Sequence, residues 1–231
     1  MTPLVRLEAV SMRFATESNP EHAVFGDINL SISAGERVAL IGRNGSGKST
    51  LLRVMARIFA PSAGAVHWAP GVSVSMLSLG LGFRPDLTGR DNAMLSCLLL
   101  GLTRKEAKAS VEQIAAFCEI GTFFDEPVRT YSAGMRARLG FGSALMNRSQ
   151  VILIDETLSV GDTFFRDKAR AALQKELTED RAVVLVTHAE AQIKSLCTSA
   201  VFLGEGAVIS AGDPRAVLSE YAAHYSEATG S

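Results

Sequence analysis

Short apolar runs separated by turn-forming residues recur along the chain. Residues 151–154 and 183–186 are uninterrupted apolar runs, which are typical of parallel strands buried on both faces. Residues 37–41 form a further short apolar strand, whereas residues 4–14 and 28–32 alternate between apolar and polar positions. This pattern predicts a small antiparallel sheet that leads into an α/β core.

Turn residues divide the remaining strands. Residues 15–22 are polar and predict a loop, and residues 61–64, Pro-Ser-Ala-Gly, predict a break in the chain. Residues 204–206, Gly-Glu-Gly, predict the turn of a hairpin. The other strands are expected at residues 65–68, 72–77, 200–203 and 207–209.

Capping residues mark where helices begin. Thr88, Ser132 and Asp162 are side chains that cap a helix N-terminus, and Thr103 with Glu106 forms a capping box. The helices are expected at residues 48–59, 88–100, 103–118, 132–146, 162–177, 189–197 and 213–221. We therefore expect a single domain over residues 1–231, with a core of about 1–80 and 147–225 and a helical subdomain of about 81–146.

Residues 42–50, GRNGSGKST, fit the phosphate-binding loop G-x-x-x-x-G-K-[ST] and follow the apolar strand directly. Glycines let the backbone N–H groups approach phosphate oxygens, and Lys48 can reach the β- and γ-phosphates as a point charge. The Ser49 hydroxyl is placed to bind Mg²⁺, and the following helix directs its positive end at the anion. The alternative, a glycine-rich turn with a chance Lys-Ser, does not account for the flanking strand and helix. The residues expected to bind nucleotide here are Gly42, Asn44, Gly45, Ser46, Gly47, Lys48, Ser49 and Thr50.

Polar side chains follow two of the buried strands. Asp155 ends the first, where a carboxylate can hold Mg²⁺ through its water shell, and Glu156 follows it as a candidate base for an attacking water. Thr187 and His188 end the second, and His188 is placed to contact the γ-phosphate. In isolation, two solvated acids and a structural histidine would explain these residues; the neighbouring phosphate loop favours the functional interpretation.

A second candidate anion site lies in the helical block. Ser132 precedes an Arg-rich helix, and Gly134 leaves backbone N–H groups open at the helix start. In isolation these residues would indicate an ordinary capped helix.

Composition excludes several classes of protein. The 23 basic and 24 acidic residues give a net charge of −1, so no basic surplus indicates nucleic acid as an obligatory partner. Cys97, Cys118 and Cys197 have neither disulfide-framework nor zinc-site spacing, which favours reduced thiols. The start of the chain has no signal-peptide pattern, and the most apolar stretch, residues 93–102, is too short to span a bilayer. We therefore expect any membrane role to depend on a partner.

Taken in order, the phosphate loop, the YSAGM segment at 131–135, the VILIDE strand and the strand-end His188 resemble the ATP-binding subunit of ABC transporters over nearly the whole chain. The resemblance implies a P-loop NTPase fold with a RecA-like core, and ATP and Mg²⁺ as ligands. It also implies a head-to-tail homodimer in which Ser132 and Gly134 bind the γ-phosphate held by a second copy. Asp162 matches the loop that links the two sites, and Phe14 matches the aromatic residue that stacks on adenine.

Three segments are similar to the subfamily that exports capsular polysaccharide, O-antigen or teichoic acid: YSAGM, TLSVGDTFFRDK at 157–168, and LSLGLGFRPDLTGRDN at 77–92. Met135 replaces the usual Gln of the signature, and no Gln occurs near Ser78, where ABC subunits generally have one. Because the chain ends soon after its last predicted helix, we expect the capsule type, without a glycan-binding domain.

The same resemblance implies an integral-membrane permease as partner, in two copies, docked around residues 80–92, and a peripheral position on the cytoplasmic face of the inner membrane. The polysaccharide itself would be handled mainly by the permease. Three alternatives stay open: an ABC subunit for another substrate, a soluble ABC ATPase without a permease, and a module that binds ATP without useful hydrolysis.

Overall fold

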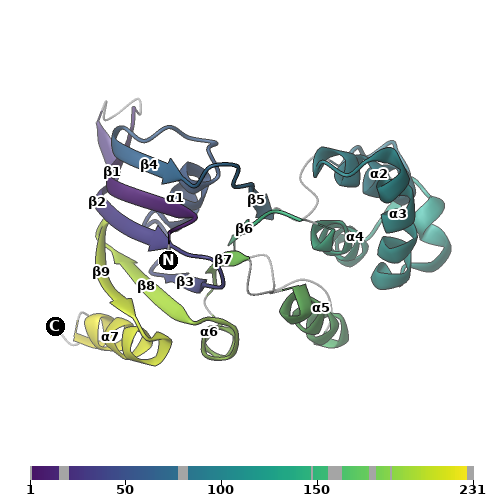
Figure 1. The fold of residues 1–231 in the computed structure, drawn as a ribbon. Coiled ribbons are helices and arrows are strands. Elements are labelled where there is room, and N and C mark those ends of the chain that lie inside the picture. Colours follow the sequence, from purple (N-terminus) through teal and green to yellow (C-terminus); the bar gives the residue numbers. More distant parts are fainter. Residues whose placement is uncertain are drawn as a thin grey trace. The chain divides into compact units, whose positions relative to one another are not determined.

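The structure, a computed structural model, describes residues 2–15, 21–77, 83–146, 148–155, 163–176, 181–187 and 189–227. The chain divides into two compact units (Figure 1). The core unit comprises Met1–Met76, Ser149–Glu156 and Leu177–Ser231, and the helical unit comprises Leu77–Arg148 and Thr157–Glu176.

An antiparallel sheet opens the core unit, in the order β2-β1-β4. Its strands are β1 (Val5–Phe14), β2 (His22–Ile32) and β4 (Ala63–Trp68). The expected antiparallel sheet is confirmed, but the expected start of β2 at residue 28 is wrong. Pairing with β1 continues to His22, opposite Phe14, and the register shifts on both sides of Val10 and again after Met12. These irregularities break the alternation of apolar positions, which is why the pattern missed the first half of β2.

A six-stranded sheet forms the centre of the core unit, in the order β5-β6-β7-β3-β8-β9. Strand β3 pairs in parallel with β7 and β8, β6 pairs in parallel with β7, and β9 is antiparallel to β8. The strands are β3 (Arg37–Ile41), β5 (Val74–Leu77), β6 (Val151–Asp155), β7 (Ala182–Val186), β8 (Ser199–Gly204) and β9 (Ala207–Gly212). The two uninterrupted apolar runs are thus confirmed as buried parallel strands.

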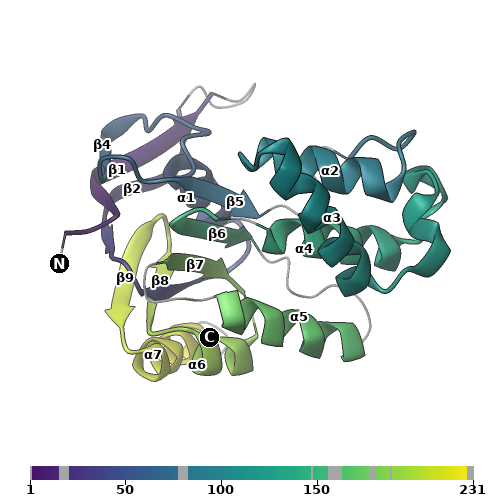
Figure 2. The ribbon, with the colours of Figure 1, turned by 45° about the vertical axis from the view of Figure 1, so that its right-hand side comes forward.

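Both faces of this sheet are covered. Val38 and Leu40 of β3 belong to a buried cluster that includes α1 (Lys48–Met55) and the antiparallel sheet. Ala39 and Ile41 point the other way, into a cluster with α6 (Glu190–Leu196) and α7 (Pro214–Glu227). Figure 2 shows α7 along β8 and β9, with α6 beside it. Alternate side chains of one strand therefore serve two cores, which requires residues 38–41 of the strand all to be apolar.

Helix α1 is shorter than expected, because it ends at Met55 rather than near residue 59. Arg57 adopts a left-handed conformation, and the N–H of Ile58 bonds back to the carbonyl of Arg53 at 2.9 Å. The Arg57 guanidinium lies 4.5 Å from the centre of the Trp68 ring. The end of α1 thus coincides with a contact between Arg57 and Trp68 of β4. Local helix propensity does not predict such a contact.

Helix α7 is longer than expected. The pattern predicts an end near residue 221, whereas the helix continues to Glu227. Asp213 caps it by accepting hydrogen bonds from the N–H groups of Arg215 and Ala216. Tyr221 and Tyr225 then pack edge-on against Phe202 of β8, and this contact supports the added turns.

The helical unit contains α2 (Gly89–Leu99), α3 (Arg104–Cys118), α4 (Ala133–Leu145), α5 (Thr163–Glu176) and two short 3₁₀ helices, η1 (Gly121–Asp125) and η2 (Val128–Thr130). The predicted caps of α2, α3 and α4 are confirmed, including the Thr103–Glu106 capping box. The sequence pattern does not predict the 3₁₀ helices. The proposed cap of α5, Asp162, lies outside the described residues.

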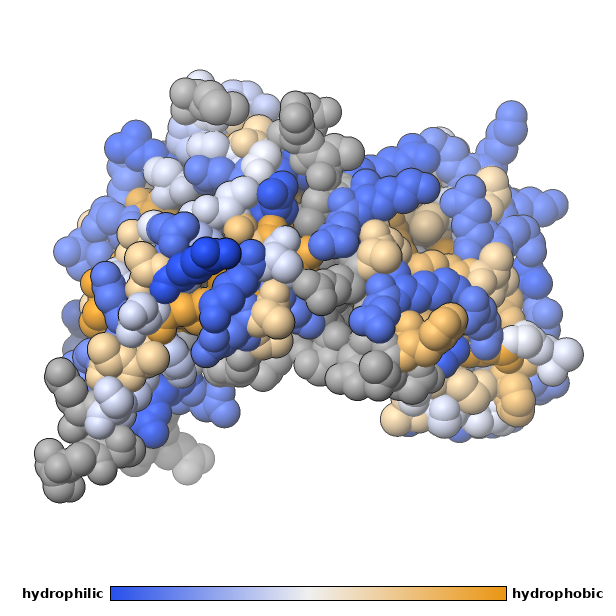
Figure 3. All heavy atoms as spheres, turned by 90° about the horizontal axis from the view of Figure 1, so that it is seen from below, coloured by the Kyte–Doolittle hydropathy of each residue, from blue (hydrophilic) through white to orange (hydrophobic). Residues whose placement is uncertain are grey.

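The apolarity of the helices and of the surface bears on a membrane role. Along the part of the chain that the structure describes, no helix has both the length and the apolarity needed to cross a membrane. Figure 3 shows apolar side chains at the surface of the helical unit, on the right of the view, among hydrophilic ones.

Candidate phosphate-binding site

The carboxyl ends of three neighbouring strands meet at one edge of the central sheet. In the parallel register Val186 of β7 lies opposite both Leu40 of β3 and Asp155 of β6. The predicted phosphate loop follows β3 directly, so the fold brings it to the end of β6, where Asp155 lies. This edge of an open α/β sheet is the usual place for a ligand site.

The loop closes around the Lys48 ammonium group. Lys48 is only 7% exposed, and its Nζ donates hydrogen bonds of 2.7 Å to the carbonyls of Gly42 and Arg43. Gly47 is left-handed and precedes the first turn of α1, whose Leu51 N–H bonds to the Gly47 carbonyl at 2.8 Å. The loop backbone and the start of α1 thus surround a buried cation, the arrangement that attracts phosphate.

Ser49 and Asp155 lie together although they are far apart in the sequence. The Ser49 hydroxyl donates a hydrogen bond of 3.1 Å to Oδ1 of Asp155. Mg²⁺ in nucleotide sites is generally held by one or two such oxygens, with phosphate and water completing its shell. Within the described ranges, no group of three or more His, Cys, Asp and Glu residues could hold a metal alone. These two oxygens therefore fit a Mg²⁺ ion that arrives with a nucleotide.

A pocket of about 280 Å³ opens over the loop. Its lining residues are Val24, Asn44, Gly45, Gly47, Lys48, Ser49, Thr50, Asp155 and Val186. The Ser46 Oγ is buried and, among the described residues, has no hydrogen-bond partner. A loop that contributes a buried lysine to this pocket, and that contains an unsatisfied serine hydroxyl, fits a phosphate group chemically.

Gly42 is required for steric reasons. A Cβ at this position would lie 2.1 Å from the backbone oxygen of Leu203. We expect Gly42→Ala to lower the free energy of unfolding of the nucleotide-free protein by about 2–3 kcal/mol, because β8 or the loop must shift.

Gly45→Ala is the matched control for this prediction. Gly45 also has a positive φ, but nothing lies within 4 Å of the place that a Cβ would occupy. This variant should lose only about 1 kcal/mol from backbone strain. Equal losses for the two variants in urea unfolding would refute the steric role of Gly42.

Phe14, the residue expected to stack on adenine, does not line the pocket over the loop. The Phe14 ring is partly buried and packs edge-on against Phe59, with ring centroids 5.6 Å apart. Its stacking on adenine stays a prediction.

The sequence pattern did not predict a second pocket beside the phosphate loop. A second pocket of about 450 Å³ borders the loop on another side. It is lined by His22, Ala23, Val24, Arg43, Asn44, Gly45, Ser46, Glu205, Gly206 and Tyr225. The Arg43 guanidinium lies 4.9 Å from the centre of the Tyr225 ring. No local signal joins Arg43 to Tyr225, because they meet only through the packing of α7.

Glu156 and His188 lie outside the described residues. The residues that flank His188 are described: Thr187 is buried, and its hydroxyl donates to Oε1 of Gln192 at 3.0 Å and accepts from the N–H of Ala189 at 3.1 Å. These bonds fix the chain on both sides of position 188. The catalytic roles of Glu156 and His188 stay predictions.

Ser132 and Gly134 lie in the helical unit, at the start of α4. The exposed Ser132 caps this helix, and its Oγ accepts a hydrogen bond of 3.2 Å from the N–H of Met135. The serine hydroxyl is thereby presented to solvent beside the positive end of the helix. This geometry fits an anion site.

A comparison with known protein families identifies the class. The ABC transporter family model matches residues 25–159, which is more than half of the chain. The chain belongs to the ABC transporter family.

Curated relatives narrow the class further. The chain is 42% identical over 194 residues to the O-antigen export system ATP-binding protein RfbB of Myxococcus xanthus, covering 84% of this chain and 44% of that protein. It is 39% identical over 195 residues to RfbB of Klebsiella pneumoniae, covering 84% and 79%. It is 34% identical over 220 residues to the teichoic acids export ATP-binding protein TagH of Enterococcus faecalis, covering 94% and 49%. The chain therefore spans less than half the length of the first and third of these relatives.

Solved structures confirm the fold class. The ATP-binding subunit of an ABC transporter matches with a TM-score of 0.81 and 20% identity, covering 95% of this chain and 93% of that one. A dimeric ATP-binding cassette, in a post-hydrolysis state with ADP and Pi, matches with a TM-score of 0.77 and 22% identity, covering 91% and 99%. The P-loop NTPase fold with an N-terminal antiparallel sheet and an inserted helical block is thus confirmed.

Proposed function

We propose that the chain is the ATP-hydrolysing subunit of an ABC exporter that drives a cell-surface polysaccharide, of the capsule or O-antigen type, across the inner membrane. The observation that carries this proposal is the phosphate loop around buried Lys48, with Ser49 hydrogen-bonded to Asp155 at the adjoining strand end. This arrangement suits a nucleotide triphosphate bound with Mg²⁺.

Each residue of the core site has a role in this proposal. Lys48 exchanges its bonds to loop carbonyls for the β- and γ-phosphates, and the loop N–H groups hold the remaining oxygens. Ser49 and Asp155 would hold Mg²⁺, which would neutralise charge on the phosphates. Glu156 orients and deprotonates the attacking water, and His188 contacts the γ-phosphate.

The complete site needs two copies of the chain. Ser132 and Gly134 of one copy face the γ-phosphate bound by the loop of the other, while Asp162 links the two sites and Phe14 stacks on adenine. The exposed, capped start of α4 supports this assignment, since it offers a solvent-exposed hydroxyl and a helix N-terminus. Closure of the homodimer over two ATP molecules supplies the mechanical step, and hydrolysis resets it.

The membrane partner is an integral-membrane permease that holds the chain on the cytoplasmic face of the inner membrane. Helix α2 supports this proposal because Leu95, Leu98 and Leu99 form an exposed apolar stripe at helical spacing. With the loop at 80–92, this stripe forms the proposed docking surface. The names of the O-antigen and teichoic acid relatives support a polysaccharide as the cargo.

We expect Leu99→Glu to reduce co-purification of the permease. Leu99 is 85% exposed, so the change should alter the free energy of unfolding by less than about 0.5 kcal/mol. Ile58→Glu, a similar change at a side chain 57% exposed in the core unit, is the matched control. If Leu99→Glu binds the permease as well as Ile58→Glu does, the docking surface lies elsewhere.

A pull-down from detergent-solubilised membranes of the source organism tests the whole proposal. Mass spectrometry should find a polytopic membrane protein in stoichiometric amount, and co-purifying glycan-synthesis proteins would support polysaccharide as the cargo. Recovery of ribosomal or DNA-repair proteins without a membrane protein would overturn the exporter and favour a soluble ABC ATPase.

A further inference from the structure

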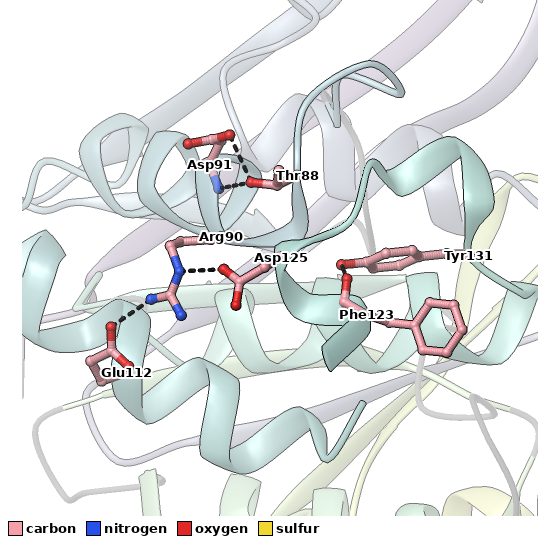
Figure 4. Close-up of polar contacts among 7 residues, drawn as sticks. All are labelled: Thr88, Arg90, Asp91, Glu112, Phe123, Asp125 and Tyr131. Carbon is pink, nitrogen blue, oxygen red and sulfur yellow. Dashed lines mark hydrogen bonds and ion pairs between the residues drawn. The ribbon is translucent and has the colours of Figure 1, made fainter. Parts of the chain in front are cut away.

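Tyr131, the residue directly before Ser132, is held at both its side chain and its backbone. Its hydroxyl donates a hydrogen bond of 2.6 Å to the carbonyl of Phe123 in η1, and the residue is only 4% exposed (Figure 4). Its own carbonyl accepts a hydrogen bond of 2.5 Å from Nη1 of Arg136, one turn into α4. Hydrogen bonds therefore hold both the side chain and the backbone carbonyl of the residue that precedes Ser132.

Gly89, the first residue of α2, leaves room for this phenol. A Cβ at position 89 would lie 2.1 Å from the Tyr131 hydroxyl and 3.0 Å from the carbonyl oxygen of Phe124. The Gly89 N–H also bonds to the carbonyl of Glu126 at 3.2 Å. Burial raises the pKa of Tyr131 to about 12, so the hydroxyl remains a donor throughout the physiological range.

Arg90 holds the same 3₁₀ segment from its other side. Its Nε donates to Oδ1 of Asp125 at 2.6 Å, and its Nη1 donates to Oε1 of Glu112 in α3 at 2.5 Å (Figure 4). The guanidinium also lies 5.2 Å from the centre of the Phe124 ring. One arginine at the start of α2 thus joins η1 to α3.

The loop that leads into α2 belongs to the same assembly. Asn92 is 1% exposed, and its Oδ1 accepts from the N–H of Arg84 at 2.7 Å while its Nδ2 donates to the carbonyl of Thr88 at 2.8 Å. The shape of residues 84–88 is therefore tied to the first turn of α2. Hydrogen bonds connect that turn to η1, and η1 to Tyr131.

We propose that Tyr131 is a positioning residue for Ser132, and that the contact of its hydroxyl with Phe123 and Gly89 fixes the start of α4 relative to the first turn of α2. The inference rests on the proposed function, in which Ser132 meets ATP bound to a second copy. Tyr131 does not touch the nucleotide. Instead, Tyr131 positions Ser132 relative to α2. The loop that precedes α2 is part of the docking surface proposed for the permease.

ATP-dependent dimerisation tests this role. Glu156→Gln should run as a dimer in light scattering when ATP and Mg²⁺ are present. Adding Tyr131→Phe, which removes only the hydroxyl, should raise the ATP concentration for half-maximal dimerisation about tenfold, since a small misplacement of a contact group is costly. The affinity of the monomer for a fluorescent ATP analogue should not change, because the phosphate loop is in the core unit.

Tyr221→Phe is the control for loss of a tyrosine hydroxyl, since Tyr221 packs on Phe202 in the core unit. Gly89→Ala is the second variant, because it displaces the phenol without altering it. Gly89→Ala should weaken dimerisation at least as much as Tyr131→Phe does. Replacing Tyr131 by a smaller residue in the Gly89→Ala variant should not restore dimerisation.

The outcomes separate the two proposals. If Glu156→Gln dimerises with ATP and the double variant dimerises equally well, the positioning role of Tyr131 is overturned while the proposed function stands. If Tyr131→Phe weakens analogue binding by the monomer as much as dimerisation, its effect is general destabilisation and the inference also falls. If Glu156→Gln never dimerises with ATP, the two-copy site and the inference both fail.

Discussion

Glu156→Gln should retain ATP binding and lose at least about 99% of its turnover, because general-base catalysis contributes about 100-fold or more. The amide has nearly the size of the carboxylate but cannot accept the proton of the attacking water. The proposed nucleotide contacts come from the phosphate loop, Ser49 and Asp155, which the change leaves intact. With hydrolysis stopped, ATP should hold two copies together.

Phosphate release and light scattering with ATP and Mg²⁺ measure the two halves of this prediction. Lys48→Ala serves as the contrasting variant, since removal of the buried ammonium should abolish nucleotide binding and dimerisation together. Near-normal phosphate release by Glu156→Gln would contradict its assignment as the base.

Ser132→Arg should lower the rate of ATP hydrolysis about 100-fold without weakening nucleotide binding to the monomer. Ser132 is exposed at the start of α4, in the helical unit, whereas the phosphate loop is in the core unit. The change removes the hydroxyl that we propose meets the γ-phosphate bound by the second copy, and it puts a long cationic side chain in its place. The lost cap should cost about 1 kcal/mol of stability, which does not unfold a domain of this size.

Thr103→Arg is the matched control, because it replaces another exposed N-cap hydroxyl of the same unit with arginine. Its loss of stability should be similar, and its hydrolysis rate should stay near that of the wild type. Steady-state phosphate release and binding of a fluorescent ATP analogue separate the two variants. If Ser132→Arg binds ATP normally and hydrolyses it at the wild-type rate, the cross-dimer site is wrong.

Mixing variants tests whether the serine acts in the partner's site. Lys48→Ala and Ser132→Arg should each be inactive alone. A mixed dimer contains one site with an intact phosphate loop and an intact Ser132, so mixing should restore part of the activity. No recovery, in a mixture shown to form mixed dimers, would place Ser132 in its own chain's site.

Features set by neighbouring residues could be read from the sequence. The caps at Thr88, Thr103 and Ser132 depend on hydrogen bonds that span three residues, and the structure has all three. The buried strands β6 and β7 were recognisable because a strand covered on both faces is apolar at each of its buried positions. The phosphate loop was recognisable because its glycines, lysine and serine are contiguous.

Features that depend on distant residues were missed. Register shifts against β1 obscured the first half of β2, and a left-handed Arg57, stacked on Trp68 of β4, ended α1 early. The two 3₁₀ helices show no apolar period. Part of the support for η1 comes from Arg90 of α2, whose Nε donates a hydrogen bond to Oδ1 of Asp125, 35 positions further along the chain.

By itself, the sequence determined the α/β class, the phosphate-loop motif and the caps at Thr88, Thr103 and Ser132, since each is written in adjacent or regularly spaced positions. Only the tertiary structure decided that the Ser49 hydroxyl meets Asp155, 106 positions away, and that Gly89 makes room for the Tyr131 hydroxyl. Both contacts arise when the chain packs elements that are remote in sequence. Their distances are fixed by the sheet register and by the helix packing, and no local pattern of residues encodes either one.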